Sequence, residues 1–162
     1  MPQIHVRENI REQFGSVVVF VLDGQRYALY LSAVERIARV VEITPLPKAP
    51  GVVLGVINVG GRIIPVVDIR KRFGLPAREI NLSDQLVIAS TSRRRVALVV
   101  DSVIGVKEDS VASMVAAEQI LPRMEYVKGV VKLEDGMILI HDLNTFLSLE
   151  EETALDSALQ ET

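Results

Sequence analysis

Short runs rich in valine and isoleucine, each closed by turn-forming residues, recur along the whole chain. The 162 residues include 25 valines and 14 isoleucines, whose Cβ-branched side chains are stiff at χ1 and pack well on a pleated surface. Two of the runs, residues 17–22 and 26–31, flank Asp23-Gly24, a dipeptide that favours a tight hairpin because both residues tolerate positive φ. Further strands are predicted at residues 55–59, 62–67, 86–91, 96–100, 127–133 and 137–141. The chain is therefore predicted to be mainly β, with short helices.

Three polar residues are placed to cap short helices, because Ser and Asp side chains accept hydrogen bonds from free backbone N–H groups. Ser32 predicts a helical turn over residues 33–39, and Asp68 predicts one over residues 69–73. Asp142 predicts a helix that continues into the acidic C-terminal end of the chain.

This C-terminal end has Leu155 and Leu159 four residues apart, so one face of a helix can lie on the rest of the protein. Such a short segment is marginal by itself, and a frayed tail is the alternative. Deletion of residues 152–162 is therefore expected to cost about 1 kcal/mol or less, from two partly buried leucines.

Two segments of the chain align with two later ones, which indicates an internal repeat. A shift of 69 residues superposes Val18 on Val87, Arg26 on Arg95, Ala28-Leu29 on Ala97-Leu98 and Val34 on Val103. A shift of 74 residues superposes Gly55-Val56 on Gly129-Val130, Ile64 on Ile138 and Asp68 on Asp142. Each half therefore has the order hairpin, connector, hairpin and Asp-capped helix. Two unrelated β-meanders are the alternative.

Each half has about five short strands, near the number that closes a small barrel and leaves no sheet edge exposed. A unit of about 70 residues buries little core by itself, so the two halves are expected to share an apolar interface. The groove between them is then a natural place for a partner to dock.

Composition argues against several classes of site and partner. The chain has no Cys and only two histidines, His5 and His141, so thiolate chemistry, disulfides and multi-histidine metal sites are unavailable. Up to Leu149 the net charge is +2, and the last thirteen residues carry −5, which gives no basic footprint for nucleic acid. The dense basic run Arg93-Arg94-Arg95 is interpreted as a solvated hairpin tip.

Hydropathy argues against membrane insertion and secretion. No apolar run approaches the roughly 18 residues that a transmembrane helix needs, and the first thirteen residues lack the apolar core of a signal peptide. The protein is expected to be soluble and cytoplasmic.

Three constellations offer a catalytic or ligand-binding reading, and the pattern favours a structural reading of each. His141-Asp142 resembles a base with its orienting acid, but neighbours at a strand end point apart. Segment 55–61 echoes a phosphate loop, yet no Lys-Ser/Thr follows and a strand comes next. Asp68, Asp101 and Asp142 would form a metal site only if the fold brought them together. No catalytic residue, cofactor site or metal site is predicted.

Five blocks of the sequence carry a family resemblance. They are FVLDGQRYALYLSAVERI (20–37), ITPLPKAP (43–50), GVINVGGRIIPVVDIRKRFGL (55–75), ALVVDSVIGV (97–106) and GVVKLEDGMILIHDLNTFL (129–147). In this order and at these spacings they closely resemble the CheW family of chemotaxis coupling proteins, over residues 14–149. The resemblance divides the chain into an N-terminal extension (1–13), a CheW-like domain of two pseudo-repeat subdomains (14–149) and an acidic C-terminal tail (150–162).

The resemblance implies a fold of two intertwined five-stranded Src-homology-3-like barrels that share a core, followed by a C-terminal helix. It also implies a scaffold without enzyme activity, which joins the cytoplasmic tips of chemoreceptors to the regulatory domain of a CheA-type histidine kinase. Such a protein is cytoplasmic and is recruited to membrane-associated receptor arrays. An interaction module of another kinase pathway, controlling pili or gliding, is the alternative; a small-molecule sensor domain is a more distant one.

A receptor-binding groove is implied at eight residues: Val34, Arg36, Ile37, Gly55, Asn58, Gly60, Arg62 and Val103. Two of them depart from the family pattern. Arg36 stands where the Val-x-Glu-Ile motif has Glu, and Gly60 stands where the Asn-Leu-Arg-Gly motif has Arg. The departures predict that a charge pair of the family is missing, unless Glu35 and Arg62 replace it.

Overall fold

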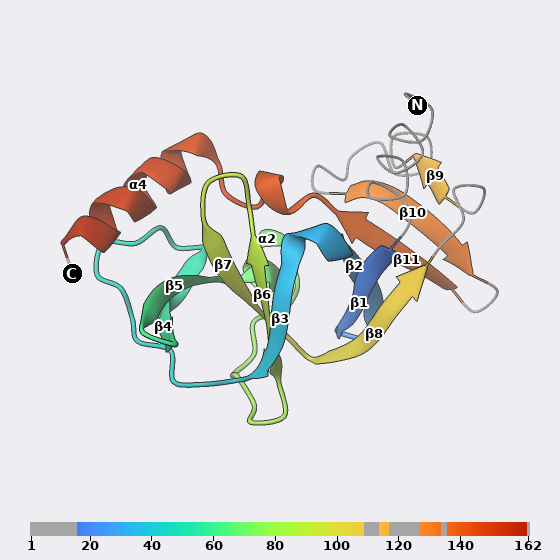
Figure 1. Cartoon of the computed structure of the whole chain (residues 1–162), viewed down its shortest axis with the longest axis horizontal. Helices are drawn as coiled ribbons and strands as arrows, with labels where there is room; N and C mark the ends of the chain where they lie inside the picture. Colours follow the sequence, from blue (N-terminus) through green and yellow to red (C-terminus); the bar gives the residue numbers. More distant parts are fainter. Residues whose placement is uncertain (1–15, 109–113, 117–126, 134–135, 162) are drawn as a thin grey trace, which may run out of the picture. The chain divides into compact units, whose positions relative to one another are not determined.

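The computed structural model describes residues 16–108, 114–116, 127–133 and 136–161. They form two compact units, each assembled from two separate stretches of the chain (Figure 1). The first unit takes its residues from 1–34 and 102–143, and the second from 35–101 and 144–162. The chain therefore passes from the first unit to the second, returns to the first and then enters the second again.

The first unit is a six-stranded sheet in the order β8-β1-β2-β11-β10-β9. Neighbouring strands are antiparallel except β2 and β11, which are parallel. The strands are β1 (Ser16–Leu22), β2 (Gln25–Tyr30), β8 (Ser102–Glu108), β9 (Met114–Ala116), β10 (Val127–Leu133) and β11 (Gly136–His141). A short helical turn, η3 (Leu143–Thr145), follows β11.

The second unit is a five-stranded sheet in the order β3-β6-β7-β5-β4, in which β5 and β7 are parallel. Its strands are β3 (Val34–Arg39), β4 (Val53–Val59), β5 (Arg62–Val67), β6 (Gln85–Ser90) and β7 (Arg95–Val100). The turn η1 (Leu31–Ala33) precedes β3, helix α2 (Ile69–Arg72) follows β5, and helix α4 (Leu149–Gln160) ends the described chain.

The strand orders confirm the internal repeat. The two sheets have the same strand order when each strand is matched to its repeat equivalent. The second sheet has the order β3-β6-β7-β5-β4, and the equivalent strands β8-β1-β2-β11-β10 are the first five of the other sheet, in the same order. Both sheets shift register at the equivalent glycines Gly55 and Gly129. Each sheet combines a hairpin of one half with three strands of the other half, so the two halves are intertwined. This result excludes two unrelated meanders, and the first sheet adds only the short strand β9.

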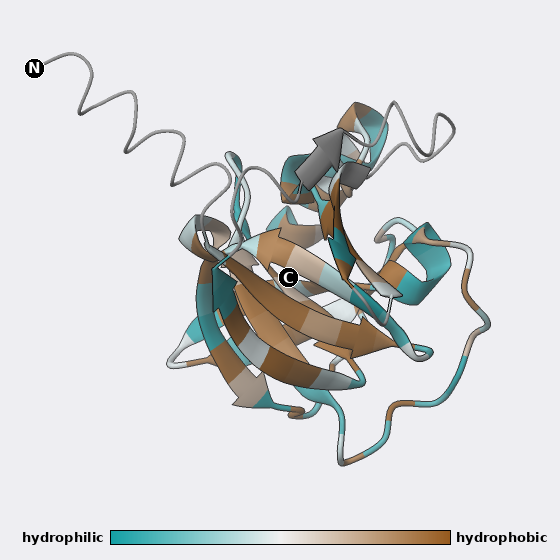
Figure 2. Ribbon diagram, turned by 90° about the vertical axis from the view of Figure 1, so that its right-hand side faces the viewer, coloured by the Kyte–Doolittle hydropathy of each residue, from teal (hydrophilic) through white to brown (hydrophobic). Residues whose placement is uncertain are grey.

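Each unit has its own cluster of buried apolar side chains, and hydrophobic colours predominate along the strands (Figure 2). In the first unit the cluster is Val17, Val19, Ala28, Val131, Ile138 and Ile140. In the second it is Ile57, Ile64, Val66, Leu86, Ile88 and Ala97. The mainly β fold is therefore confirmed. An apolar interface shared by the two units stays a prediction.

Equilibrium unfolding should follow a single cooperative transition, because every sheet contains strands from both halves of the chain. Far-UV circular dichroism in urea measures it, since the chain lacks Trp. A fragment of residues 1–80 should not fold, because β6 and β7 are then missing from the middle of the second sheet. Two well-separated transitions, or a stably folded fragment, would contradict this prediction.

Of the three predicted helix caps, the structure confirms one and corrects two. Asp68 caps α2, accepting a hydrogen bond from the Lys71 backbone N–H at 3.1 Å. The helix predicted after Ser32 is wrong: Ser32 lies inside η1, and the following residues form edge strand β3 beside β6. Only the three-residue turn η3 follows Asp142 directly. For residues 34–39, pairing within the sheet overrides the local capping signal.

Helix α4 begins instead after Ser148, its N-cap residue, which forms a capping box. The Ser148 hydroxyl accepts from Glu151 N, and the Glu151 side chain accepts from Ser148 N at 2.8 Å. Leu155 and Ala158 of α4 are fully buried in the second unit. The C-terminal helix is thus confirmed. Leu155 is fully buried rather than partly buried, so deleting the helix is now expected to cost more than about 1 kcal/mol.

Candidate partner-binding site

Strand β3 supplies three of the predicted receptor-groove residues. Val34 and Ile37 are half-buried, and Arg36 is exposed at this edge of the sheet. The neighbouring Glu35 forms an ion pair with Arg95 of β7, at 2.8 Å between Oε1 and Nε. Glu35 is therefore engaged by Arg95 and does not supply a free acid in place of the missing family Glu.

The β4–β5 hairpin supplies Asn58, Gly60 and Arg62. Gly60 and Gly61 have φ of 59° and 84°, which closes a two-residue turn between Val59 and Arg62. The Asn58 side-chain Oδ1 accepts a hydrogen bond from Gly61 N at 3.0 Å. Asn58 thus holds the turn in shape, and Gly60 and Arg62 are exposed on it. A Cβ at Gly60 would meet nothing within 4 Å.

Gly55 has a packing role in β4. The chain beyond β3 returns to β4, and Thr44 and Val56 exchange two backbone hydrogen bonds of 2.9 and 2.8 Å. A Cβ on Gly55, whose φ is 154°, would lie 2.3 Å from the Thr44 carbonyl oxygen. Only glycine fits where these two backbones approach so closely.

The predicted groove residues are thus divided between the two units. Arg36 and Ile37 share β3, and the residues at 55–62 share one hairpin, all in the second unit. Val103 lies in β8 of the first unit, where it is half-buried and pairs with Phe20 of β1. A single groove that joins all eight residues stays a prediction.

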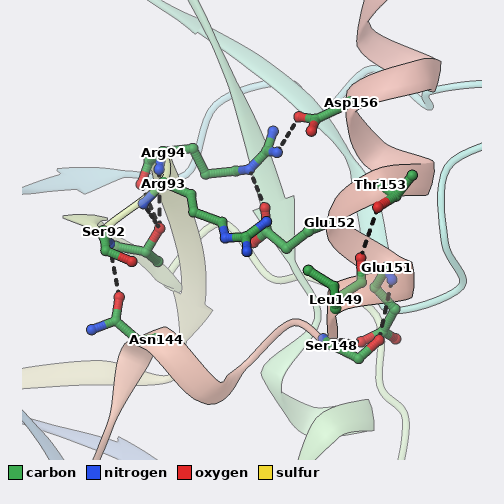
Figure 3. A network of polar contacts seen from close by, with 11 residues as sticks. Ser92, Arg93, Arg94, Asn144, Ser148, Leu149, Glu151, Glu152, Thr153 and Asp156 are labelled. Carbon is green, nitrogen blue, oxygen red and sulfur yellow. Dashed lines mark hydrogen bonds and ion pairs between the residues drawn. The ribbon is translucent and has the colours of Figure 1, made fainter.

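The arginine run at 93–95 corrects the sequence analysis, because its three side chains have three different surroundings. Arg93 is exposed, and Arg95 binds Glu35. Arg94 is only 13% exposed and lies between Glu152 and Asp156 of α4 (Figure 3). Its Nε–Glu152 Oε2 distance is 2.9 Å. Arg94 is therefore not solvated as predicted, but binds the acidic C-terminal helix.

Two further cations bind acidic residues at the C-terminal end of the chain. Arg72 of α2 binds Glu151 at 2.5 Å, and Lys48 binds Glu161 at 3.3 Å. Burial raises the pKa of Glu151, but the hydrogen bonds from Ser148 and the pairing with Arg72 outweigh it and leave the pKa below its ordinary value. The opposite charges of the body and the C-terminal end were the only sequence signal for this contact.

A second charged network fixes the segment between α2 and β6. Arg78 forms two hydrogen bonds to Asp84, at 2.9 and 2.8 Å, and also binds Asp101. Arg70 binds Asp101 at 2.8 Å. Burial raises the pKa of Asp84, yet the hydrogen bonds from Arg78 and from the Asn81 N–H outweigh it and leave the pKa below its ordinary value. Asp84 is 3% exposed, so an irregular segment is anchored by a buried carboxylate.

The free energy of unfolding should therefore fall as the pH drops below about 4. A carboxyl group whose pKa is lowered in the folded state stabilises it above the unfolded pKa, and this contribution is lost as the pH falls through the folded value. Urea midpoints at pH 7 and pH 3 measure the loss. Asp84→Asn should be less stable at pH 7 and should lose less between the two pH values; an unchanged loss would contradict the assignment.

A family model described as the CheW-like domain matches residues 16–151, which include both sheets and the start of α4. The chain belongs to the CheW-like domain family. A chemotaxis protein CheW of Rhizobium meliloti is 31% identical over 140 residues, covering 85% of this chain and 90% of that protein. Another, of Bacillus subtilis, is 31% identical over 138 residues, covering 83% and 87%.

A solved structure gives the same result. The crystal structure of the scaffolding protein TtCheW from Thermoanaerobacter tengcongensis has a TM-score of 0.76 and 30% sequence identity to this chain. The match covers 85% of this chain and 94% of that one. The predicted CheW family fold is therefore confirmed.

Within this CheW-like domain, the residues considered for chemistry have structural contacts. Asp68 caps α2, and Asp101 binds Arg70 and Arg78. The ring of the buried His141 lies tilted against that of Tyr27, with 5.3 Å between the ring centroids. Among the described residues, no three His, Cys, Asp or Glu side chains gather as a metal would require. In the same part of the chain, no helix is long and apolar enough to cross a membrane.

Proposed function

We propose that this CheW-like protein is a non-enzymatic adaptor that couples the cytoplasmic tips of chemoreceptors to the regulatory domain of a CheA-type histidine kinase. Membership of the family across residues 16–151 is the observation that carries the proposal. Relatives of similar length are named chemotaxis proteins, and the solved relative is named a scaffolding protein. The proposed location is the cytoplasm, next to receptor arrays.

The proposed adaptor acts by binding and adds no chemistry of its own. It changes the activity of the kinase only if it binds two kinase conformations with different affinity, because coupling is a difference of binding free energies. Each of the two sheets contains strands from both halves of the chain, so each unit offers its own surface to a partner.

We assign the receptor contact to the predicted groove residues and give them two kinds of role. Arg36 and Arg62 are exposed charges that meet the partner directly. Asn58, Gly60 and Gly55 shape the β4–β5 hairpin that carries Arg62. The half-buried Val34, Ile37 and Val103 supply apolar contact.

Binding to purified partners tests the proposal. The immobilised protein should bind both a CheA-type regulatory domain and a chemoreceptor tip encoded in the same genome. In a reconstituted assay, its addition should increase the effect of the receptor on the activity of the kinase. Binding only to the kinase of a pilus or gliding pathway would support the alternative pathway. Binding to neither class of kinase would contradict the adaptor function.

Restoring the family charges should change partner choice. The double variant Arg36→Glu with Gly60→Arg should bind receptor tips from species whose CheW proteins carry Glu and Arg at these positions, and each single variant should bind them less well, because one charge lacks its mate. Gly60 has φ of 59°, so Arg there adds backbone strain, and the melting temperature of every variant is the control. If the unmodified protein binds those tips equally well, the departures do not set specificity.

A further inference from the structure

Strand β3 presents exposed arginines that no acid of the described residues neutralises with an ion pair. Glu35 is held by Arg95 at 2.8 Å. Arg36 is exposed, and no acidic group of the described residues forms an ion pair with it. Arg39 is also exposed on β3 and Glu42 lies three residues beyond it, so with Arg95 the net charge near this edge is positive.

The β4–β5 hairpin adds a charge of the same sign. Arg62 is exposed beside the Gly60-Gly61 turn, and no described acid pairs with it either. The remaining residues of the hairpin turn are Asn58, Val59 and the two glycines, which carry no charge. Both segments assigned to the receptor contact therefore offer cations and no free anion.

We propose that the receptor surface facing β3 is acidic, with an aspartate or glutamate opposite Arg36. This inference rests on the proposed receptor contact and names the chemistry of the partner there. A cation that is buried in an interface loses the free energy of its hydration. A carboxylate on the partner compensates for this loss by forming a charge-assisted hydrogen bond with the cation. Complementary charges also accelerate encounter and disfavour partners of the wrong sign. A receptor with Lys or Arg at this position is rejected.

The test compares charge variants for binding to each chemoreceptor tip encoded in the same genome. Arg36→Gln should weaken binding roughly fivefold, and Arg36→Glu more than about tenfold. Glu35→Gln should keep or strengthen binding, because it frees Arg95 and removes a negative charge. Raising the salt from about 50 mM to about 300 mM should weaken binding by the unmodified protein more than binding by Arg36→Gln.

Two controls separate this effect from general charge and from folding. Arg93→Gln removes an exposed arginine from the β6–β7 turn, outside the assigned contact, and should bind as the unmodified protein does. All variants should bind the kinase regulatory domain equally. On the receptor side, changing the facing acid to Lys should abolish binding to the unmodified protein and restore it to Arg36→Glu.

The outcomes are distinct. If the unmodified protein binds no receptor tip, the proposed receptor contact fails and this inference fails with it. If it binds a tip and Arg36→Glu binds that tip as tightly or more tightly, the receptor contact stands and the acidic partner surface is wrong. Weaker binding by Arg36→Glu, with rescue by the receptor Lys variant, supports the inference.

Discussion

Replacing Gly55 by alanine should lower the free energy of unfolding by about 3 kcal/mol or more. The new Cβ would lie 2.3 Å from the Thr44 carbonyl oxygen and 2.8 Å from its carbon, so one backbone segment has to move. That movement breaks the two hydrogen bonds between Thr44 and Val56, at the junction of β4 with the chain beyond β3. Urea unfolding followed by far-UV circular dichroism measures the loss.

Gly24→Ala is the matched control for this prediction. Gly24 also has positive φ, at 77°, but an added Cβ there would meet nothing within 4 Å. Its substitution should cost only about 1 kcal/mol, from backbone strain. Equal losses for the two variants would show that the contact with Thr44 does not determine the effect.

Removing helix α4 by truncation after Ser148 should destabilise the protein by about 3 kcal/mol or more. Leu155 is fully buried, and losing a buried leucine alone typically costs about 2 to 5 kcal/mol. Truncation also leaves Arg94, which is 13% exposed, without Glu152 and Asp156. The urea midpoint of the truncated protein is the measurement.

Point variants separate the two contributions of α4. Leu155→Ala should account for most of the apolar loss, whereas Leu159→Ala, at a half-buried position, should cost clearly less. Arg94→Ala should destabilise more than Arg93→Ala, because it strands the buried Glu152 carboxylate. A truncated protein as stable as the full chain would show that α4 is only a surface addition.

Residues close together in the sequence are sufficient to predict a turn or a helix cap whose contacts lie within a few residues. The Asp23-Gly24 hairpin is predicted and found, with φ of 50° and 77°, because a tight turn needs residues that tolerate positive φ. The Asp68 cap is found for a similar reason, since its hydrogen bond reaches only to Lys71. The repeat predicts equivalent strands in both halves, because apolar alternation and turns recur with it.

Local chemistry failed where a competing partner was distant in the sequence. Residues 34–39 read as a helix after Ser32, yet pairing with β6 makes them strand β3. The candidate site also depends partly on nearby residues and partly on distant ones. Its residues were named from family motifs, but only the structure shows that Asn58 stabilises the Gly60-Gly61 turn and that Glu35 is engaged by Arg95.

The sequence by itself determined the β class, the repeat, most hairpins and the family, because these depend on spacing and on residues close in the chain. The tertiary structure alone decided that Arg94 binds acids 58 and 62 residues away, that Gly55 has no room for a side chain and that Leu155 is core. Such contacts form only after the strands have paired in register, and nothing in the residues between them specifies which distant groups will then meet.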